Sequence, residues 1–141
     1  MKKHSLAILA YMLPTFPLGF FWHLTIFADY YKSLEVYRDD VIIPFGITSM
    51  FIQGIIWSVL YQRLFSGESI LNGAVKFASV ACPLAWSFLV LAVSAKHRMT
   101  SVSGYLVIET AFIVTQYLIV SPLIAWVYTD KSRAAEPKAL H

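Results

Sequence analysis

The sequence predicts an all-α, polytopic membrane protein, built as a bundle of four transmembrane helices. Of its 141 residues, 58% are hydrophobic and only 13% are charged, and the mean hydropathy is +0.65. Four apolar stretches each approach the length of about 20 residues that crosses ~30 Å of hydrocarbon. They cover residues 6–27, 41–65, 74–95 and 104–128. Because the links are short, we expect a single transmembrane domain over residues 1–141, with any site among the helices or in the loop 28–40.

The first stretch follows a basic start and contains two interior prolines. Its opening resembles a signal peptide, but the apolar run is too long and no small-residue cleavage site precedes Asp29. We therefore interpret it as a retained helix. Pro14 and Pro17 each remove a backbone hydrogen bond, so we expect this helix to bend. The loop 28–40 alternates aromatic, acidic and aliphatic residues, which favours a short helix on the outer surface and a docking surface for a partner.

The second and third stretches contain features that predict close helix packing. Pro44 stands in the opening turn of the second stretch, where proline is tolerated, and Pro83 is central in the third, where it predicts a kink. Small residues recur at three- and four-residue spacing in both stretches, a pattern that lets helices approach closely. Cys82 is the only cysteine, so an intramolecular disulfide is excluded.

The fourth stretch contains Glu109, the most informative residue of the chain. An ionisable group inside a membrane segment costs roughly 2.5–3.5 kcal/mol and therefore faces a partner or a pathway. Gln116 follows seven residues later and shares its helical face. We expect this face to point inward and to form an intramembrane polar network with Gln53 of the second helix and with Thr110. The network is either ordinary interhelical glue or the lining of a polar channel.

The distribution of basic residues predicts the orientation, since cytoplasmic flanks are enriched in lysine and arginine. With the N-terminus inside, the inner side collects Lys2, Lys3, Arg63, Lys76, Lys131, Arg133 and Lys138, against Lys32, Arg38, Lys96 and Arg98 outside. We therefore expect both termini to be cytoplasmic. This topology accounts for the net charge of +3 without a basic patch interleaved with aromatic residues, so a nucleic-acid partner is not expected.

Depth in the membrane brings the remaining polar residues to one face. His23, His97 and Glu109 all lie within about one helical turn of the outer ends of their helices, with Asp29 just above them. They form a candidate polar or ion site. Two imidazoles and a carboxylate could bind a transition metal, although no metal-ligand spacing is present, and His23 and Glu109 could pass a proton. In the structural alternative, Glu109 exists only to pair with a neighbouring histidine or cation.

Two segments resemble a family of small bacterial four-helix membrane proteins that is described only as a domain of unknown function. The first segment reads Trp22-His23-Leu24 followed by Phe27, Asp29, Tyr31 and Leu34; the second reads Ile43-Pro44, Gly46, Ser49-Met50 and Ile52-Gln53-Gly54. The resemblance implies a multi-pass protein of the bacterial inner membrane over nearly the whole chain. It implies no activity and no catalytic residue.

Taken together, the sequence favours a non-catalytic role, as an accessory, assembly or stabilising subunit of a membrane complex. Its partners would be the lipid bilayer and either the other subunits of that complex or further copies of the same chain. The first alternative is a small transporter or an ion- or proton-binding protein that uses the outer His/Glu site. The second is a metal-dependent membrane enzyme with His23, His97 and Glu109 as ligands. No cofactor is required by the sequence.

Overall fold

A computed structural model describes residues 2–129 and is helical throughout its regular structure. Four helices are long and apolar enough to cross a membrane: Lys2–Ile26, Ile43–Phe65, Ile70–Lys96 and Val102–Tyr128. The predicted all-α class and the four candidate spans are therefore confirmed, and they indicate a multi-pass membrane protein. The basic residues Lys131, Arg133 and Lys138, which contributed to the predicted orientation, lie outside the described residues.

Two of the four spans contain a π-helical turn on the C-terminal side of a proline. The first span is α1 (Lys2–Phe21) followed by the π-helical turn η1 (Trp22–Ile26), which begins five residues after Pro17. The third is α4 (Ile70–Trp86), the π-helical turn η2 (Ser87–Leu91) and α5 (Ala92–Lys96), with η2 beginning four residues after Pro83. Single π-turns inside α-helices are rare and occur often at functional sites.

The other elements are α2 (Ala28–Leu34), α3 (Ile43–Phe65) and α6 (Val102–Tyr128). Polar caps explain where two of the helices start. The Ser69 hydroxyl accepts a hydrogen bond from the backbone N–H of Asn72 at the start of α4, and the Ser101 hydroxyl accepts one from Gly104 at the start of α6. Serine is among the preferred N-cap residues because its oxygen pairs with N–H groups that the first turn leaves free.

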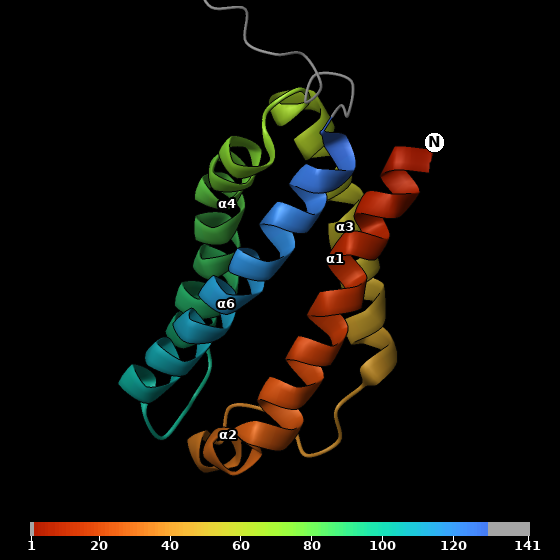
Figure 1. Ribbon diagram of the computed structural model, residues 1–141. Helices are drawn as coiled ribbons and strands as arrows, with labels where there is room; N and C mark the ends of the chain where they lie inside the picture. The colour runs from red at the N-terminus through yellow and green to blue at the C-terminus, as the bar shows by residue number, and fades with distance from the viewer. Residues whose placement is uncertain (1, 130–141) are drawn as a thin grey trace, which may run out of the picture.

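Helix α6 is the centre of the bundle. In its most apolar window 44% of the residues are buried, against 17% in each of the other three spans. It packs against α4 on one side and α1 on the other, and α1 packs in turn against α3 (Figure 1). Lys2 and Thr129, the two ends of the described chain, lie at the same end of the bundle, where the His4 ring contacts the Tyr128 hydroxyl at 3.2 Å.

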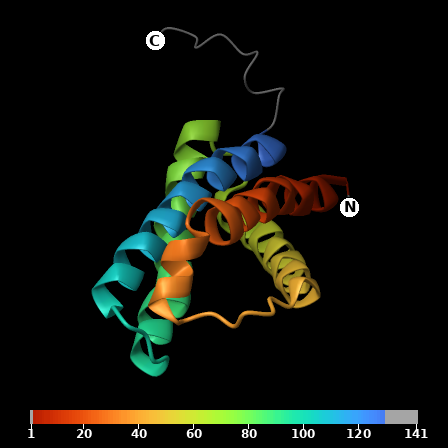
Figure 2. The ribbon, with the colours of Figure 1, turned by 90° about the horizontal axis from the view of Figure 1, so that it is seen from below.

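Helix α3 is buried in its second half only, although Met50 of its first half packs against the core and Gln53 accepts a hydrogen bond from Tyr11. Its buried residues are Gly54, Trp57, Ser58 and Tyr61. Gly54 lets α3 approach α1 closely, because a Cβ atom there would lie 3.3 Å from Cγ2 of Ile8. The first half, which begins at Ile43, stands away from α6 at the end of the bundle where the 35–42 segment crosses to it (Figure 2). The bundle is therefore closed near the chain ends and spread apart near α2.

The short helix predicted in the loop 28–40 is present as α2, and it packs on the start of α6. Tyr31 and Leu34 of α2 form a small core with Tyr105 of α6. The end of α2 is capped from the segment before α6, because Thr100 donates its backbone N–H to the Leu34 carbonyl and its hydroxyl to the Ser33 carbonyl. These contacts fix α2 and the 35–42 segment over the spread end of the bundle.

Candidate functional site

The buried carboxylate of Glu109 is the centre of the candidate site. Glu109 lies about two turns inside α6 and is 3% exposed. Its Oε1 atom lies 3.1 Å from Nε2 of His23 and accepts a 2.5 Å hydrogen bond from the Tyr37 hydroxyl. His23 belongs to η1, and Tyr37 to the segment between α2 and α3. Three separate segments of the chain therefore meet at one carboxylate oxygen.

The hydrogen bonds of His23 determine how many protons this pair holds. The Nδ1 atom lies 2.9 Å from the carbonyl oxygen of Gly19, which can only accept, so Nδ1 carries a hydrogen. One further hydrogen must then lie between Nε2 of His23 and Oε1 of Glu109, on one atom or the other. The pair is either imidazolium with carboxylate or imidazole with carboxylic acid. In both states it binds one shared proton and has no net charge.

Aromatic rings surround the His23 side of the pair. The ring centroid of His23 lies 4.8 Å from that of Tyr31, 5.8 Å from Tyr37 and 4.5 Å from Phe112. Tyr31 and Tyr37 are stacked on each other at 5.2 Å. These rings cover one side of the pair, while His23, Tyr37 and Glu109 also line an open cavity.

The two tyrosines of this cluster remain neutral hydrogen-bond donors. Burial raises the pKa of the Tyr37 hydroxyl above its ordinary value, and the nearby charge of Glu109 raises it further. The same two causes, in the same order, raise the pKa of Tyr31. The carboxylate of Glu109 acts on the Tyr31 hydroxyl through its charge and through hydrogen bonding, although this hydroxyl has no hydrogen bond of standard geometry within the described residues.

An open cavity of about 530 Å³ reaches the pair. It lies between α1, the first half of α3, the 35–42 segment and α6, in the spread end of the bundle. Most of its wall is apolar, as with Phe16, Phe20, Leu24, Ile47, Met50 and Phe112. Its polar groups form two sets, one around Glu109 at the α2 end and one deeper, with Tyr11, Thr15, Ser49, Gln53 and Gln116. A volume of this size is typical of pockets for small molecules.

The other two residues of the predicted outer site are placed differently. His97 lines the same cavity, but it is exposed at the end of α5 and shares no hydrogen bond with the His23 pair among the described residues. Asp29 is exposed on α2 and does not line the cavity. Within residues 2–129, no three histidine, cysteine or acidic side chains are close enough together to hold a metal ion.

The predicted amide network forms around a residue that the sequence analysis did not single out. The Tyr11 hydroxyl donates to Oε1 of Gln53, and Nε2 of Gln116 donates to the Tyr11 hydroxyl at 3.2 Å. Tyr11 therefore bridges the two amides, which do not contact each other directly. A phenol at mid-membrane depth needs a hydrogen-bond partner, and this need is the signal that could have identified Tyr11. For Tyr37, in an irregular segment, the sequence offers no comparable signal.

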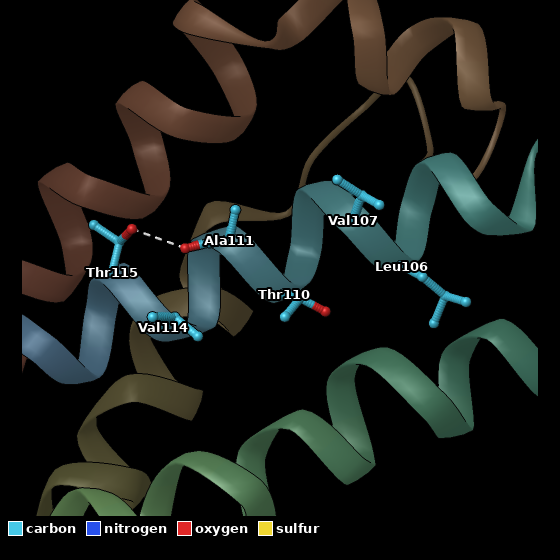
Figure 3. Close-up of a pocket in the computed structure, with 6 residues that line it drawn as sticks. All are labelled: Leu106, Val107, Thr110, Ala111, Val114 and Thr115. Carbon is cyan, nitrogen blue, oxygen red and sulfur yellow. Dashed lines mark hydrogen bonds between the residues drawn. The ribbon is translucent and has the colours of Figure 1, made fainter.

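Thr110 lies on another face of α6, away from the amides. Its hydroxyl accepts a 2.8 Å hydrogen bond from Nε1 of Trp86 on α4. It borders a second hollow of about 640 Å³, lined by residues of α6 alone, in which the Thr115 hydroxyl donates to the Ala111 carbonyl (Figure 3). Both hydroxyls of this hollow are already engaged and no titratable group lines it, so the smaller cavity at Glu109 is the better candidate site.

The fold and the site define a class of protein, a four-helix membrane protein with a buried histidine–carboxylate pair at the edge of an apolar cavity. Comparisons with protein families, with curated proteins and with solved structures found no match to this chain. The resemblance to a family of small four-helix membrane proteins therefore stays a prediction. The function must be argued from the site itself.

Proposed function

We propose that this protein is a small transporter that binds a mainly apolar solute in the cavity between α1, α3 and α6. The observation that carries the proposal is that the cavity reaches Glu109, the one carboxylate in its lining. A carboxylate whose only role is to pair helices is best enclosed completely, because water weakens its hydrogen bonds. At Glu109 the paired groups instead form part of the wall of a cavity.

The distribution of polar groups supports the same proposal. Pockets for small molecules are mostly apolar, with a few polar groups that fix the orientation of the ligand. Here the polar groups stand at two depths, near Glu109 and near Gln116, which are seven residues and about 10 Å apart along α6. A solute could therefore be held at one end and released toward the other.

An accessory subunit of a membrane complex is the second candidate. It is favoured by the first half of α3, where Phe45, Ile47 and Phe51 are exposed and no residue before Gly54 is buried. A helix of another chain could cover this face. A metal-dependent enzyme has no comparable support among residues 2–129, since His97 stands apart from the His23 pair.

Substitutions at Gly46 test the cavity without touching the pair. Gly46 lines the cavity, and a Cβ atom there would meet no heavy atom within 4 Å. Gly46→Trp should therefore fill the space, and Gly46→Ala is the matched control. The protein would be purified in mild detergent from its own membrane, and mass spectrometry would identify both bound small molecules and co-purified chains.

The transporter proposal expects a small molecule that accompanies the wild type and Gly46→Ala and is lost from Gly46→Trp. A stoichiometric second chain, with no small molecule that responds to Gly46→Trp, would instead establish the accessory subunit.

We also propose the bacterial inner membrane as the location, with both termini cytoplasmic. The described chain ends lie at one end of the bundle, and the basic residues Lys2 and Lys3 belong to that end. Under this orientation the cavity and α2 belong to the outer half of the membrane. Reporter fusions at each terminus would be active in the cytoplasm, and periplasmic activity at either terminus would contradict the proposal.

A further inference from the structure

The charges around the cavity are arranged in favour of a positive ligand. Among residues 2–129, Glu109 is the only carboxylate in its lining. Of the basic groups, Arg38 is already paired with Asp40, through Nε to Oδ1 at 2.9 Å and Nη2 to Oδ2 at 3.1 Å. His97 is exposed at the rim. The only deep histidine is His23, and its Nε2 is engaged with Glu109.

The wall next to the carboxylate is rich in aromatic faces, which attract cations through the negative centre of the ring. Phe16 and Phe20 of α1 and Phe112 of α6 line the cavity, together with the rings of Tyr37 and Tyr105. An anion in the same place would be repelled by the charge of Glu109 and by the negative centres of the aromatic rings. A neutral solute would gain from the apolar wall but would leave the carboxylate's charge unused.

We propose that the solute is a hydrophobic organic cation, and that its binding to Glu109 displaces the proton shared by His23 and Glu109. This inference rests on the proposed function, because it names the class of solute that the cavity takes. With the proton in place, the pair has no net charge, and an entering cation would leave the buried site positive. When the proton leaves, His23 becomes neutral imidazole and Glu109 an unshared carboxylate, and the cation restores neutrality. One cation enters and one proton goes to water, so charge and protons balance.

The groups that face the pair from every neighbouring element are compatible with this exchange. Tyr31 of α2, Tyr37 of the 35–42 segment and Tyr105 of α6 are phenols that stay protonated near neutral pH. Arg38 keeps its charge and its partner Asp40. His97 is a second ionisable side chain in the lining of the cavity, so its contribution to any proton count must be measured separately. The exchange therefore predicts that cation affinity rises with pH, by up to tenfold per pH unit while the pair holds its proton.

The experiment uses two probes of nearly the same size and shape and of opposite charge, tetraphenylphosphonium and tetraphenylborate. Binding to the purified protein in non-ionic detergent would be measured by titration calorimetry in two buffers of different ionisation enthalpy, which gives the number of protons released. The Gly46→Trp protein serves as the blank for partition into micelles, and His97→Gln removes the second histidine.

The expected result is binding of tetraphenylphosphonium at least tenfold tighter than that of tetraphenylborate, with close to one proton released per cation. His97→Gln should leave both values unchanged, and Glu109→Gln should abolish the proton release and weaken cation binding at least tenfold. Proton release and its pH dependence are measured on the wild-type protein, so the inference can be tested even if the Glu109→Gln protein does not fold.

Equal or tighter binding of the borate, or cation binding without proton release, would overturn the inference. The proposed function would survive either of these results, because Gly46→Trp would still block binding in the cavity. If neither probe binds and no co-purified solute responds to Gly46→Trp, the inference and the proposed function fail together.

Discussion

Substitutions of Glu109 give the most direct measure of what its buried hydrogen bonds contribute. In Glu109→Gln one side-chain oxygen can still accept from His23 and Tyr37, the other becomes an amide NH2, and the negative charge of the imidazolium–carboxylate state is lost. A hydrogen bond to a charged group contributes about 1.5–3 kcal/mol and a neutral one about 0.5–1.5 kcal/mol. The loss is therefore about 1 kcal/mol for each of the two bonds at 3.1 Å and 2.5 Å, or about 2 kcal/mol in all.

Glu109→Ala is expected to cost distinctly more, because it removes the acceptor itself. The donor of His23 is then left unpaired, at about 1–3 kcal/mol, and the missing side chain enlarges a cavity, whereas the hydroxyl of the 44% exposed Tyr37 can bond to water instead. We expect about 3–5 kcal/mol, the range measured when one partner of a buried ion pair is removed. The two variants of one position should thus differ by about 1–3 kcal/mol in the free energy of unfolding.

The assay is reversible unfolding in detergent, followed by tryptophan fluorescence and circular dichroism. Asp29→Asn is the matched control, since it removes an exposed carboxylate of α2 and should change the free energy of unfolding by less than about 0.5 kcal/mol. If Glu109→Ala costs no more than Glu109→Gln, the two hydrogen bonds do not stabilise the bundle, and the reasoning from their geometry is refuted.

Three further predictions concern packing, pH and the cap of α2. Gly73→Ala should lower the free energy of unfolding by about 1–3 kcal/mol, because the new Cβ atom would lie 2.0 Å from the Tyr61 hydroxyl. Gly46→Ala should not destabilise the protein, since its Cβ atom would meet no heavy atom within 4 Å, and equal losses for the two variants in the same assay would contradict this. The pKa of Tyr37 is higher in the folded protein than its ordinary value of 10.0, so Tyr37 stabilises the fold fully below pH 10.0 and loses this contribution as the pH rises further. Tyr37→Phe should therefore make the free energy of unfolding less sensitive to pH above 10.0. Thr100→Val should speed amide hydrogen exchange in α2, since it removes the hydroxyl donor at the end of this helix, and unchanged exchange would count against the cap.

Hydropathy predicted the positions of the membrane spans, and the rise per residue predicted how deep the polar residues lie in them. Both predictions succeeded because they depend only on distance along a helix. The predicted second span starts at 41 and α3 at Ile43; both end at Phe65. The same depth argument put His23 and Glu109 at one level, where they lie in contact. Depth says nothing about direction around the helix axis, however. Thr110 follows Glu109 directly and is turned by about 100°, so it contacts α4 instead of the amides.

Features that depend on how the helices are arranged could not be predicted from the sequence. Tyr37 reaches Glu109 only because α2 docks on α6 and carries the 35–42 segment over the bundle. The π-turn that contains His23 follows Pro17, but a proline predicts a bend without predicting its form. The cavity itself lies where no residue of α3 before Gly54 is buried, a property of the whole bundle.

The two ends of the bundle use similar chemistry in different surroundings, and the contrast is informative about Glu109. At the end with the chain termini, His4, Ser58 and Tyr128 bond to one another, with the His4 ring 2.7 Å from the Ser58 hydroxyl and that hydroxyl 2.8 Å from Tyr128. None of the three lines either cavity. Nδ1 of His4 and the hydroxyls of Ser58 and Tyr128 are satisfied within this set, which is what stability alone requires of buried polar atoms. At the α2 end, histidine and tyrosine again meet an oxygen acceptor, but a carboxylate takes the place of the serine, and a cavity opens onto the group. Each of these differences costs stability. Their occurrence together at one site is the strongest reason to look for a ligand there.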